Sequence, residues 1–250
     1  MTQLINGDCI EEMKKLDDNS VDLLFTDLPY SCTNCSWDKP IDLDKFWKEV
    51  NRICKINCPM FFCCNMRFGV ELINSNPKNY RYEYIWQKSR KVGHLNSGKM
   101  RLTSHELIFV FYKKLPVYNV KKYHKHKFLE DFAVKEIRND DGCESLYSNE
   151  KGKKHRFKID GKIRDAEPRY EPPLPGSILT IKTQKNLHQT QKPVDLINFF
   201  IKYYSNEGDT VLDPTMGSGS TGVSCKELNR NFIGIELDEK IFKVAEKRLN

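Results

Sequence analysis

Apolar and polar positions alternate along most of the chain in blocks that predict strands and helices in turn. Short apolar runs typical of strands occupy residues 4–7, 21–26, 59–64, 82–86, 106–112, 210–212 and 231–236. Apolar residues at helical spacing fall between them, at residues 8–16, 43–53, 68–73, 193–201, 223–228 and 238–249. Strands that alternate with helices predict an α/β fold, a mainly parallel sheet covered by helices.

This alternation stops between Lys113 and Gly176. Apolar residues become sparse there, basic and aromatic residues alternate, and four prolines close the stretch at Pro168, Pro172, Pro173 and Pro175. The pattern predicts an inserted module. We therefore expect three parts: residues 1–112, the insert 113–176, and residues 177–250.

The net charge of +7 is concentrated in the insert. Sixteen Lys and Arg stand against ten Asp and Glu between Lys113 and Tyr170, which accounts for six of the seven excess charges. Concentrated positive charge is typical of a surface that binds a polyanion such as nucleic acid. Taken alone, the charge is equally compatible with a solvated surface, and it does not distinguish DNA from RNA.

Composition narrows the class of protein. A chain of 250 residues with 39% apolar and 30% charged residues can bury one substantial core. No apolar run is long enough to span a bilayer, and the acidic start (Asp8, Glu11, Glu12) is unlike a signal peptide. Nine cysteines, an odd number, indicate a reducing compartment. We expect a cytoplasmic protein without structural disulfides and without membrane contact.

A glycine-rich turn follows the predicted strand at 210–212. The strand stops at Asp213 and Pro214, and Gly217, Gly219 and Gly222 then precede a predicted helix. The spacing G-x-G-x-x-G lets backbone approach a nucleotide-like ligand, either NAD or S-adenosylmethionine. A phosphate-binding P-loop would need Gly-Lys-Ser/Thr, which is missing. An ordinary strand-to-helix turn would also fit the spacing.

Two further acids stand at the ends of predicted strands. Glu236 ends the next strand, where a carboxylate can bind both hydroxyls of a ribose; it could instead cap the helix that begins near Asp238. The run Asp27–Tyr30 (Asp-Leu-Pro-Tyr) places a carboxylate beside a rigid proline and an aromatic ring. Asp27 and the Leu28 carbonyl could accept the hydrogens of an amino group on a flat base, on which Tyr30 would stack. A plain turn with a packed tyrosine is the alternative.

Two shorter patterns complete the candidates. The run 188–193 (His-Gln-Thr-Gln-Lys-Pro) precedes a helix, where Lys192 could help to bind a carboxylate; a capping loop is the alternative. Cys32 and Cys35 form a C-x-x-C pair, but no second pair with suitable spacing accompanies it. We therefore predict no metal site.

Together these motifs resemble the β-type amino-methylating DNA methyltransferases, which use S-adenosylmethionine. Asp27–Tyr30 is similar to their Asp-Pro-Pro-Tyr motif, residues 213–221 to Asp-Pro-Phe-x-Gly-Ser-Gly-Thr-Thr, and 188–193 to His-Pro-Thr-Gln-Lys-Pro. Residues 6–9, 86–88 and 105–106 also resemble family landmarks. The order, with the catalytic motif first and the cofactor motif last, is that of the β type.

The resemblance implies a circularly permuted, Rossmann-like methyltransferase core, with the insert 113–176 as the target-recognition module that binds DNA. It implies a target-base pocket made by Asp27, Leu28, Pro29 and Tyr30. It also implies that Asp8 contacts the adenine of the cofactor, Glu236 its ribose, and Asp213 with the glycine turn its methionine part, near Lys192. The implied cofactor-binding residues are Asp8, Cys9, Lys192, Asp213, Thr215, Gly217, Gly219, Ser220, Thr221 and Glu236.

Three departures from the family pattern bear on these expectations. Leu28 replaces a proline but keeps its carbonyl, Gln189 replaces a second proline, and Ser220 replaces a threonine. An Asp at the start of the catalytic motif favours adenine N6 as the methylated atom, while cytosine N4 stays open. An NAD-dependent oxidoreductase and a nucleic-acid-binding protein without catalysis are the alternatives of another class. A homodimer and a cognate restriction enzyme are both compatible with the resemblance.

Overall fold

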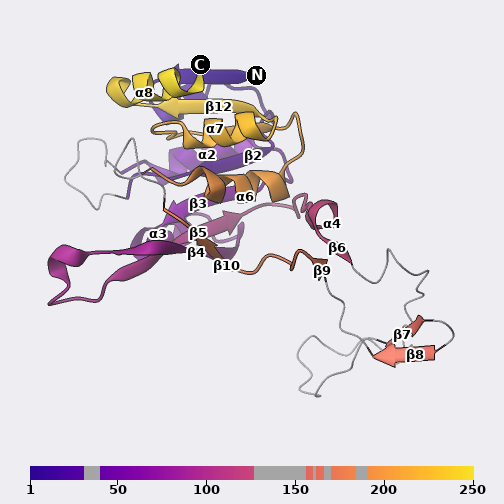
Figure 1. Cartoon of the computed structure of the whole chain (residues 1–250). Coiled ribbons are helices and arrows are strands. Elements are labelled where there is room, and N and C mark those ends of the chain that lie inside the picture. The colour runs from indigo at the N-terminus through magenta and orange to yellow at the C-terminus, as the bar shows by residue number, and fades with distance from the viewer. Residues whose placement is uncertain (31–39, 127–155, 160–161, 166–169, 184–190) are drawn as a thin grey trace. The chain divides into compact units, whose positions relative to one another are not determined.

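The computed structural model describes residues 1–30, 40–126, 156–159, 162–165, 170–183 and 191–250 (Figure 1). They form two compact units. One, which we call the core, comprises Met1–Asn119 and Gly176–Asn250, and the other comprises Val120–Pro175. All the candidate site residues named for the target base and the cofactor belong to the core.

An eight-stranded sheet runs through the core in the order β1-β12-β11-β2-β3-β5-β4-β10. β5 is antiparallel to its neighbours β3 and β4, and the other adjacent pairs are parallel. The α/β fold prediction is confirmed, with one reversed strand. The bounds are β1 Thr2–Asn6, β2 Leu23–Thr26, β3 Met60–Cys64, β4 Tyr80–Val92, β5 Thr103–Phe111, β10 Ile178–Ile181, β11 Thr210–Asp213 and β12 Asn231–Glu236.

Helices cover both faces of this sheet. Successive side chains of a strand point to opposite faces, and Phe61 and Phe62 of β3 show this directly. The ring of Phe62 lies 5.3 Å from Trp47 of α2, whereas the ring of Phe61 lies 4.6 Å from Phe200 of α6. The helices are α1 Cys9–Met13, α2 Leu43–Ile53, α3 Met66–Ser75, α6 Val194–Tyr204, α7 Ser220–Glu227 and α8 Glu239–Leu249.

The two central strands come from distant parts of the sequence. Leu23 and Leu24 of β2 pair with Val211 and Leu212 of β11. From β2 the chain continues through α2 to β3, and from β11 it continues through α7 to β12 on the other side. The strand order therefore reverses between β2 and β11. In open α/β sheets, ligands bind beyond the carboxyl ends of the strands at such a point.

Several elements differ from their predicted extents. β10 was not predicted, because only Leu179 of this short edge strand is buried. β4 continues to Val92 instead of ending near Trp86, since pairing with β5 holds its polar end. α7 begins at Ser220 rather than Val223, directly after the glycine turn. These differences concern edges and ends, where burial contributes little to the sequence pattern.

The second unit contains short elements. α4 (Val120–Tyr123) leads into β6 (Lys125–His126), which pairs with β9 (Tyr170–Glu171), while β7 (Arg156–Ile159) pairs with β8 (Lys162–Asp165). The unit begins seven residues after the predicted insert does. Tyr118 and Asn119 belong to the core, where the Asn119 amide donates to the Tyr203 carbonyl at 2.8 Å. No helix of the described residues is long and apolar enough to cross a bilayer.

Candidate active site

A cavity of about 1480 Å³ lies in the core at the ends of β2 and β11. Residues predicted for the target base and residues predicted for the cofactor line the same space. The topology explains this, because the β2–β11 pair brings Asp27 and Asp213 together across 186 positions of sequence. The predicted residues on its wall are Asp8, Cys9, Asp27, Leu28, Pro29, Tyr30, Lys192, Asp213, Thr215, Gly217, Ser220, Thr221 and Glu236. Gly219 is not on the wall.

The three glycines of the turn have two different roles. Gly217 and Gly219 have φ angles of +53° and +80°, which side-chain-bearing residues rarely adopt. Gly222 lies in α7, and a Cβ there would approach Leu249 Cδ1 to 2.6 Å and Phe232 Cε1 to 2.8 Å. The first two glycines shape the turn against the cavity, and the third lets α7 pack closely on α8 and β12.

Asp213 is a buried carboxylate at the end of β11. Its oxygens accept a hydrogen bond from the Thr221 hydroxyl at 2.5 Å and one from the Thr215 amide at 3.2 Å. Burial raises the pKa of Asp213 to about 7, although these two bonds oppose the rise. Within the described residues no Lys or Arg pairs with it. A buried carboxylate without a cation suits a ligand that brings a positive charge.

Glu236 and Asp8 form another part of the wall. Glu236 accepts from the backbone amides of Gly217 (3.0 Å) and Asp238 (2.8 Å), so it joins the glycine turn to the start of α8. Burial raises its pKa. Asp8 caps α1 as predicted, accepting from the Ile10 amide at 3.0 Å. These two of the three predicted cofactor carboxylates thus also accept hydrogen bonds from the protein's own backbone.

Asp27 directly follows β2 and lines the cavity. The Tyr30 hydroxyl donates to Oδ1 of Asp27, and the Lys192 ammonium donates to Oδ2. The Tyr30 ring stacks on Phe68 with its centroid 5.2 Å away. Burial raises the pKa of the Tyr30 hydroxyl well above its usual value, and Asp27 contributes to the rise. The hydroxyl therefore remains a hydrogen-bond donor to Asp27.

Lys192 connects Asp27 to a second carboxylate, Glu106, for which the sequence pattern predicts no role. Its Nζ lies 3.6 Å from Glu106 Oε2, and Lys88 donates to the other oxygen of Glu106. Burial alone would raise the pKa of Glu106, but Lys192 and Lys88 outweigh it and lower that pKa. Burial alone would lower the pKa of Lys192, but Asp27 and Glu106 raise it instead. Two ammonium groups and two carboxylates thus alternate beside the predicted base pocket.

Two short runs that resemble the family pattern, residues 86–88 and 105–106, contain Lys88 and Glu106 of this cluster, but the resemblance alone predicts no role for them. β4 and β5 carry them, and Trp86 pairs with Glu106 across the antiparallel ladder. Lys192 had been expected at the methionine part of the cofactor. The ion pair with Asp27 was not expected, because nothing in one sequence fixes which acid a distant lysine meets.

Thr215 couples the two halves of the site. Its hydroxyl lies 2.8 Å from the Thr26 hydroxyl and donates to the Asp27 carbonyl at 3.2 Å. Its amide donates to Asp213. One residue of the glycine turn therefore contacts the ends of both central strands: Thr26 and Asp27 at the end of β2, and the Asp213 carboxylate at the end of β11.

Some predicted features lie outside the described residues. These are His188, Gln189 and Thr190 of the motif before α6, and Cys32 and Cys35 of the C-x-x-C pair. In the part of the chain that the structure describes, no group of three His, Cys, Asp or Glu side chains could hold a metal ion.

With this geometry in place, comparison with known proteins identifies the class. The DNA methylase family model N6_N4_Mtase matches residues 21–247. The chain therefore belongs to this family of N6 and N4 amino-methyltransferases, as the motifs predicted. Its members act on DNA with S-adenosylmethionine, so the predicted cofactor is confirmed and the NAD alternative is wrong.

Two relatives align with all or nearly all of this chain. The Type II methyltransferase M.HinfI of Haemophilus influenzae is 28% identical over 279 aligned residues, which cover 100% of this chain and 68% of the relative. The DNA adenine methyltransferase YhdJ of Escherichia coli K12 is 27% identical, with 99% of this chain and 82% of YhdJ covered.

Solved structures share the fold. The M1.HpyAVI–SAM complex has a TM-score of 0.64 at 25% identity, with both chains covered completely. The PvuII DNA methyltransferase, described as cytosine-N4-specific, has a TM-score of 0.67 at 16% identity, with 100% of this chain and 86% of the other covered. The second likeness concerns the fold alone. Relatives and neighbours thus include adenine-specific and cytosine-specific enzymes.

Proposed function

We propose that this protein is a site-specific DNA methyltransferase that transfers a methyl group from S-adenosylmethionine to N6 of adenine. The observation that carries the proposal is the Asp-Leu-Pro-Tyr run at the cavity end of β2, which begins with Asp27 rather than Ser. The likeness to YhdJ, whose name specifies adenine, supports the same base.

The cavity fits S-adenosylmethionine on features of this chain. The uncompensated carboxylate of Asp213 suits the ammonium of the methionine part, and Gly217 leaves open space where a Cβ would stand. Glu236 and Asp8 suit the ribose and the adenine. When bound, the cofactor supplies an activated methyl group on a sulfonium sulfur.

The residues of the chain would bind and orient the other reactant, an adenine flipped out of the duplex. Asp27 and the Leu28 carbonyl accept the two hydrogens of the amino group, which directs its lone pair towards the methyl donor. Each oxygen of Asp27 has a second lone pair, so the bonds from Tyr30 and Lys192 do not preclude this. Tyr30, backed by Phe68, stacks on the base. Asp27 is then placed to take up the proton that the nitrogen loses.

The test of the base is to map methylated positions in DNA incubated with the purified protein and S-adenosylmethionine. N6-methyladenine at one recurring sequence is the expected result. N4-methylcytosine would overturn the adenine assignment and leave the family membership intact.

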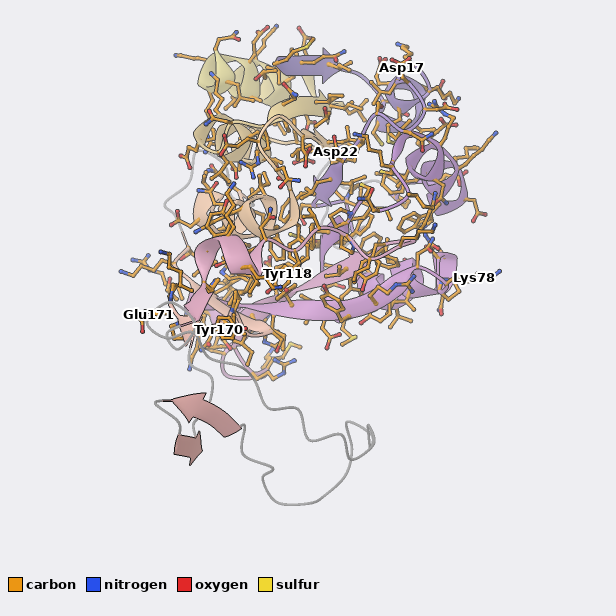
Figure 2. All side chains as sticks on the ribbon, turned by 90° about the vertical axis from the view of Figure 1, so that its right-hand side faces the viewer. Asp17, Asp22, Lys78, Tyr118, Tyr170 and Glu171 are labelled. Carbon is orange, nitrogen blue, oxygen red and sulfur yellow. The ribbon has the colours of Figure 1, made fainter. Side chains whose placement is uncertain are left out.

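The test of the site is Asp27→Ala, which should abolish methyl transfer while calorimetry shows cofactor binding unchanged. Asp17→Ala is the matched control, because Asp17 is exposed and lies on the loop that leads into the start of β2, whereas Asp27 follows the end of that strand (Figure 2). It should keep full activity. Methylation by the Asp27→Ala protein would contradict the assigned role.

A further inference from the structure

β4 and β5 extend beyond the strands beside them. β3 pairs with β5 only along Leu107–Phe111, and β10 pairs with β4 only along Ile85–Lys88. Past Lys88, within the described residues, β4 pairs with β5 alone. Figure 1 shows the two strands and their connection running out past the rest of the sheet. We call residues 89–101 the outer hairpin.

The outer hairpin carries positive charge and no compensating acid. All thirteen of its residues are exposed, and they include four cations but no Asp or Glu. Across the part of the chain that the structure describes, these four side chains form no ion pair. Such a surface attracts the phosphates of nucleic acid. The four are Arg90, Lys91, Lys99 and Arg101.

Large apolar side chains stand at the tip of this basic element. Leu95 is fully exposed, and Met100 is 66% exposed. Gly93, with φ +96°, turns the chain into the short 3-10 helix His94–Asn96 that presents Leu95, and the His94 ring is held 2.9 Å from the Lys91 carbonyl. Apolar side chains exposed among cations suit an occupant that offers both phosphates and an apolar interior. Stacked bases in duplex DNA provide both.

The first half of the outer hairpin lines the active-site cavity. Arg90, Lys91, Val92 and His94, together with Lys88 just before the hairpin, line the same cavity as Asp27. A ligand bound to the outer hairpin therefore lies beside the cavity that a flipped base must enter. Enzymes that flip a base must compensate for unstacking it, and an apolar side chain inserted into the stack is one way to do so.

We propose that the outer hairpin binds duplex DNA at the target base pair. Its cations hold the phosphates on either side, and Leu95 enters the stack where the target base leaves it. The proposal rests on the proposed function, since it assumes that a base is flipped into the cavity. It adds a DNA contact in the core that is separate from the basic insert.

The phosphate contacts are tested with Arg90→Ala/Lys91→Ala. Binding to a duplex that contains the mapped recognition site should weaken about tenfold near 0.1 M salt, and the salt dependence should become shallower by about two charges. The matched control is Lys78→Ala/Lys114→Ala, which removes two exposed cations from the other end of the core. Lys78, labelled in Figure 2, precedes the start of β4 and so lies at the end of the β4–β5 ladder opposite the hairpin. It should bind as the wild type does.

The wedge is tested with Leu95→Ala on two duplexes. On a fully paired duplex, the methylation rate and the fluorescence of 2-aminopurine at the target should both fall about tenfold. A mismatch at the target base pair lowers the work of flipping, so it should restore Leu95→Ala to nearly the wild-type rate. The same mismatch should not restore the methylation rate of Arg90→Ala/Lys91→Ala, because that variant lacks phosphate contacts. Ile56→Ala, which also removes an exposed apolar side chain, should behave as the wild type.

The outcomes separate this inference from the proposed function. A wild-type protein that methylates no DNA would refute the function itself. The role of the hairpin would be overturned if the wild type methylates DNA and both variants match it. The variants are Leu95→Ala and Arg90→Ala/Lys91→Ala, and the properties compared are DNA binding, base flipping and methylation rate. A Leu95→Ala defect that the mismatch fails to relieve would refute the wedge.

Discussion

Lys192 is the cation that links the two carboxylates beside the proposed base pocket. It stands between Asp27 and Glu106, whose side chains keep only 27% and 28% of their exposure. Lys192→Met should leave two carboxylates facing each other without the cation that separates them. We expect the free energy of unfolding, measured in urea, to fall by about 1–3 kcal/mol. Breaking a fully buried ion pair costs about 3–5 kcal/mol, and the loss is smaller here because both acids still reach solvent.

The companion variant Lys192→Met/Glu106→Gln should recover part of that loss, because the second substitution removes one of the repelling charges. Lys14→Met, which breaks an exposed pair with Glu11, is the control and should change stability little. Equal unfolding free energies for Lys192→Met and the wild type would show that the ion pair contributes nothing to stability.

Asp213 should make both stability and cofactor affinity depend on pH. Its pKa in the folded protein is about 7, above the ordinary value of 3.8. The folded state favours the protonated form of Asp213. The stability that this group contributes is therefore fully present below about pH 4 and is lost as the pH rises through 7. Asp213→Asn should therefore raise the melting temperature at pH 8 by several degrees and have much less effect at pH 5.

Cofactor binding should show the opposite trend. The ionised carboxylate attracts a cationic ligand, so the affinity of the wild type for S-adenosylmethionine should increase between pH 6 and pH 8. Asp213→Asn should bind more weakly and show a flatter profile in calorimetry. Parallel pH profiles for the two proteins would contradict the assignment of Asp213 to a cationic group.

At the scale of elements, the glycine turn combines a conformational and a packing requirement. Gly222→Ala should destabilise the protein by about 1–3 kcal/mol in urea, because the added methyl overlaps Leu249 and Phe232. Gly217→Ala meets no neighbour within 4 Å but must adopt a φ of +53°, so about 1 kcal/mol is expected. Gly176→Ala, with open space and no positive φ, should leave stability unchanged.

The elements predicted best are those whose residues are buried. The runs that became β2, β3 and β12 and the helix Leu43–Ile53 follow directly from apolar spacing. β10 and the outer end of β4 depend on pairing with partners far along the chain, which apolar spacing does not record. The same limit applies to the site. The motifs predicted Asp27, Asp213 and Glu236, but the contacts of Lys192 with Asp27 and Glu106 appear only once the chain is folded.

At the scale of the molecule, the second compact unit should be dispensable for the core. Replacing Val120–Pro175 by a short Gly/Ser linker should leave a folded protein that binds S-adenosylmethionine, because every described residue of the cavity belongs to the core. DNA methylation should fall at least about tenfold, because the replaced segment carries fourteen Lys and Arg that can contact phosphates. Circular dichroism, calorimetry and a methylation assay measure the three properties. Full methylation by the shortened protein would refute the target-recognition role of the insert.

The hydroxyl of Thr215 that donates to the Asp27 carbonyl joins residues 188 positions apart in the sequence. On the ribosome, the first partner is made long before the second. The edge of β2, the strand that leads into Asp27, is therefore covered only after β11 has been synthesised. Any chain released before residue 213 lacks both the turn proposed to bind the cofactor and that cover, so we expect a truncated product not to methylate DNA. Methyl transfer is therefore expected only from chains in which β11 and the turn after it have been made.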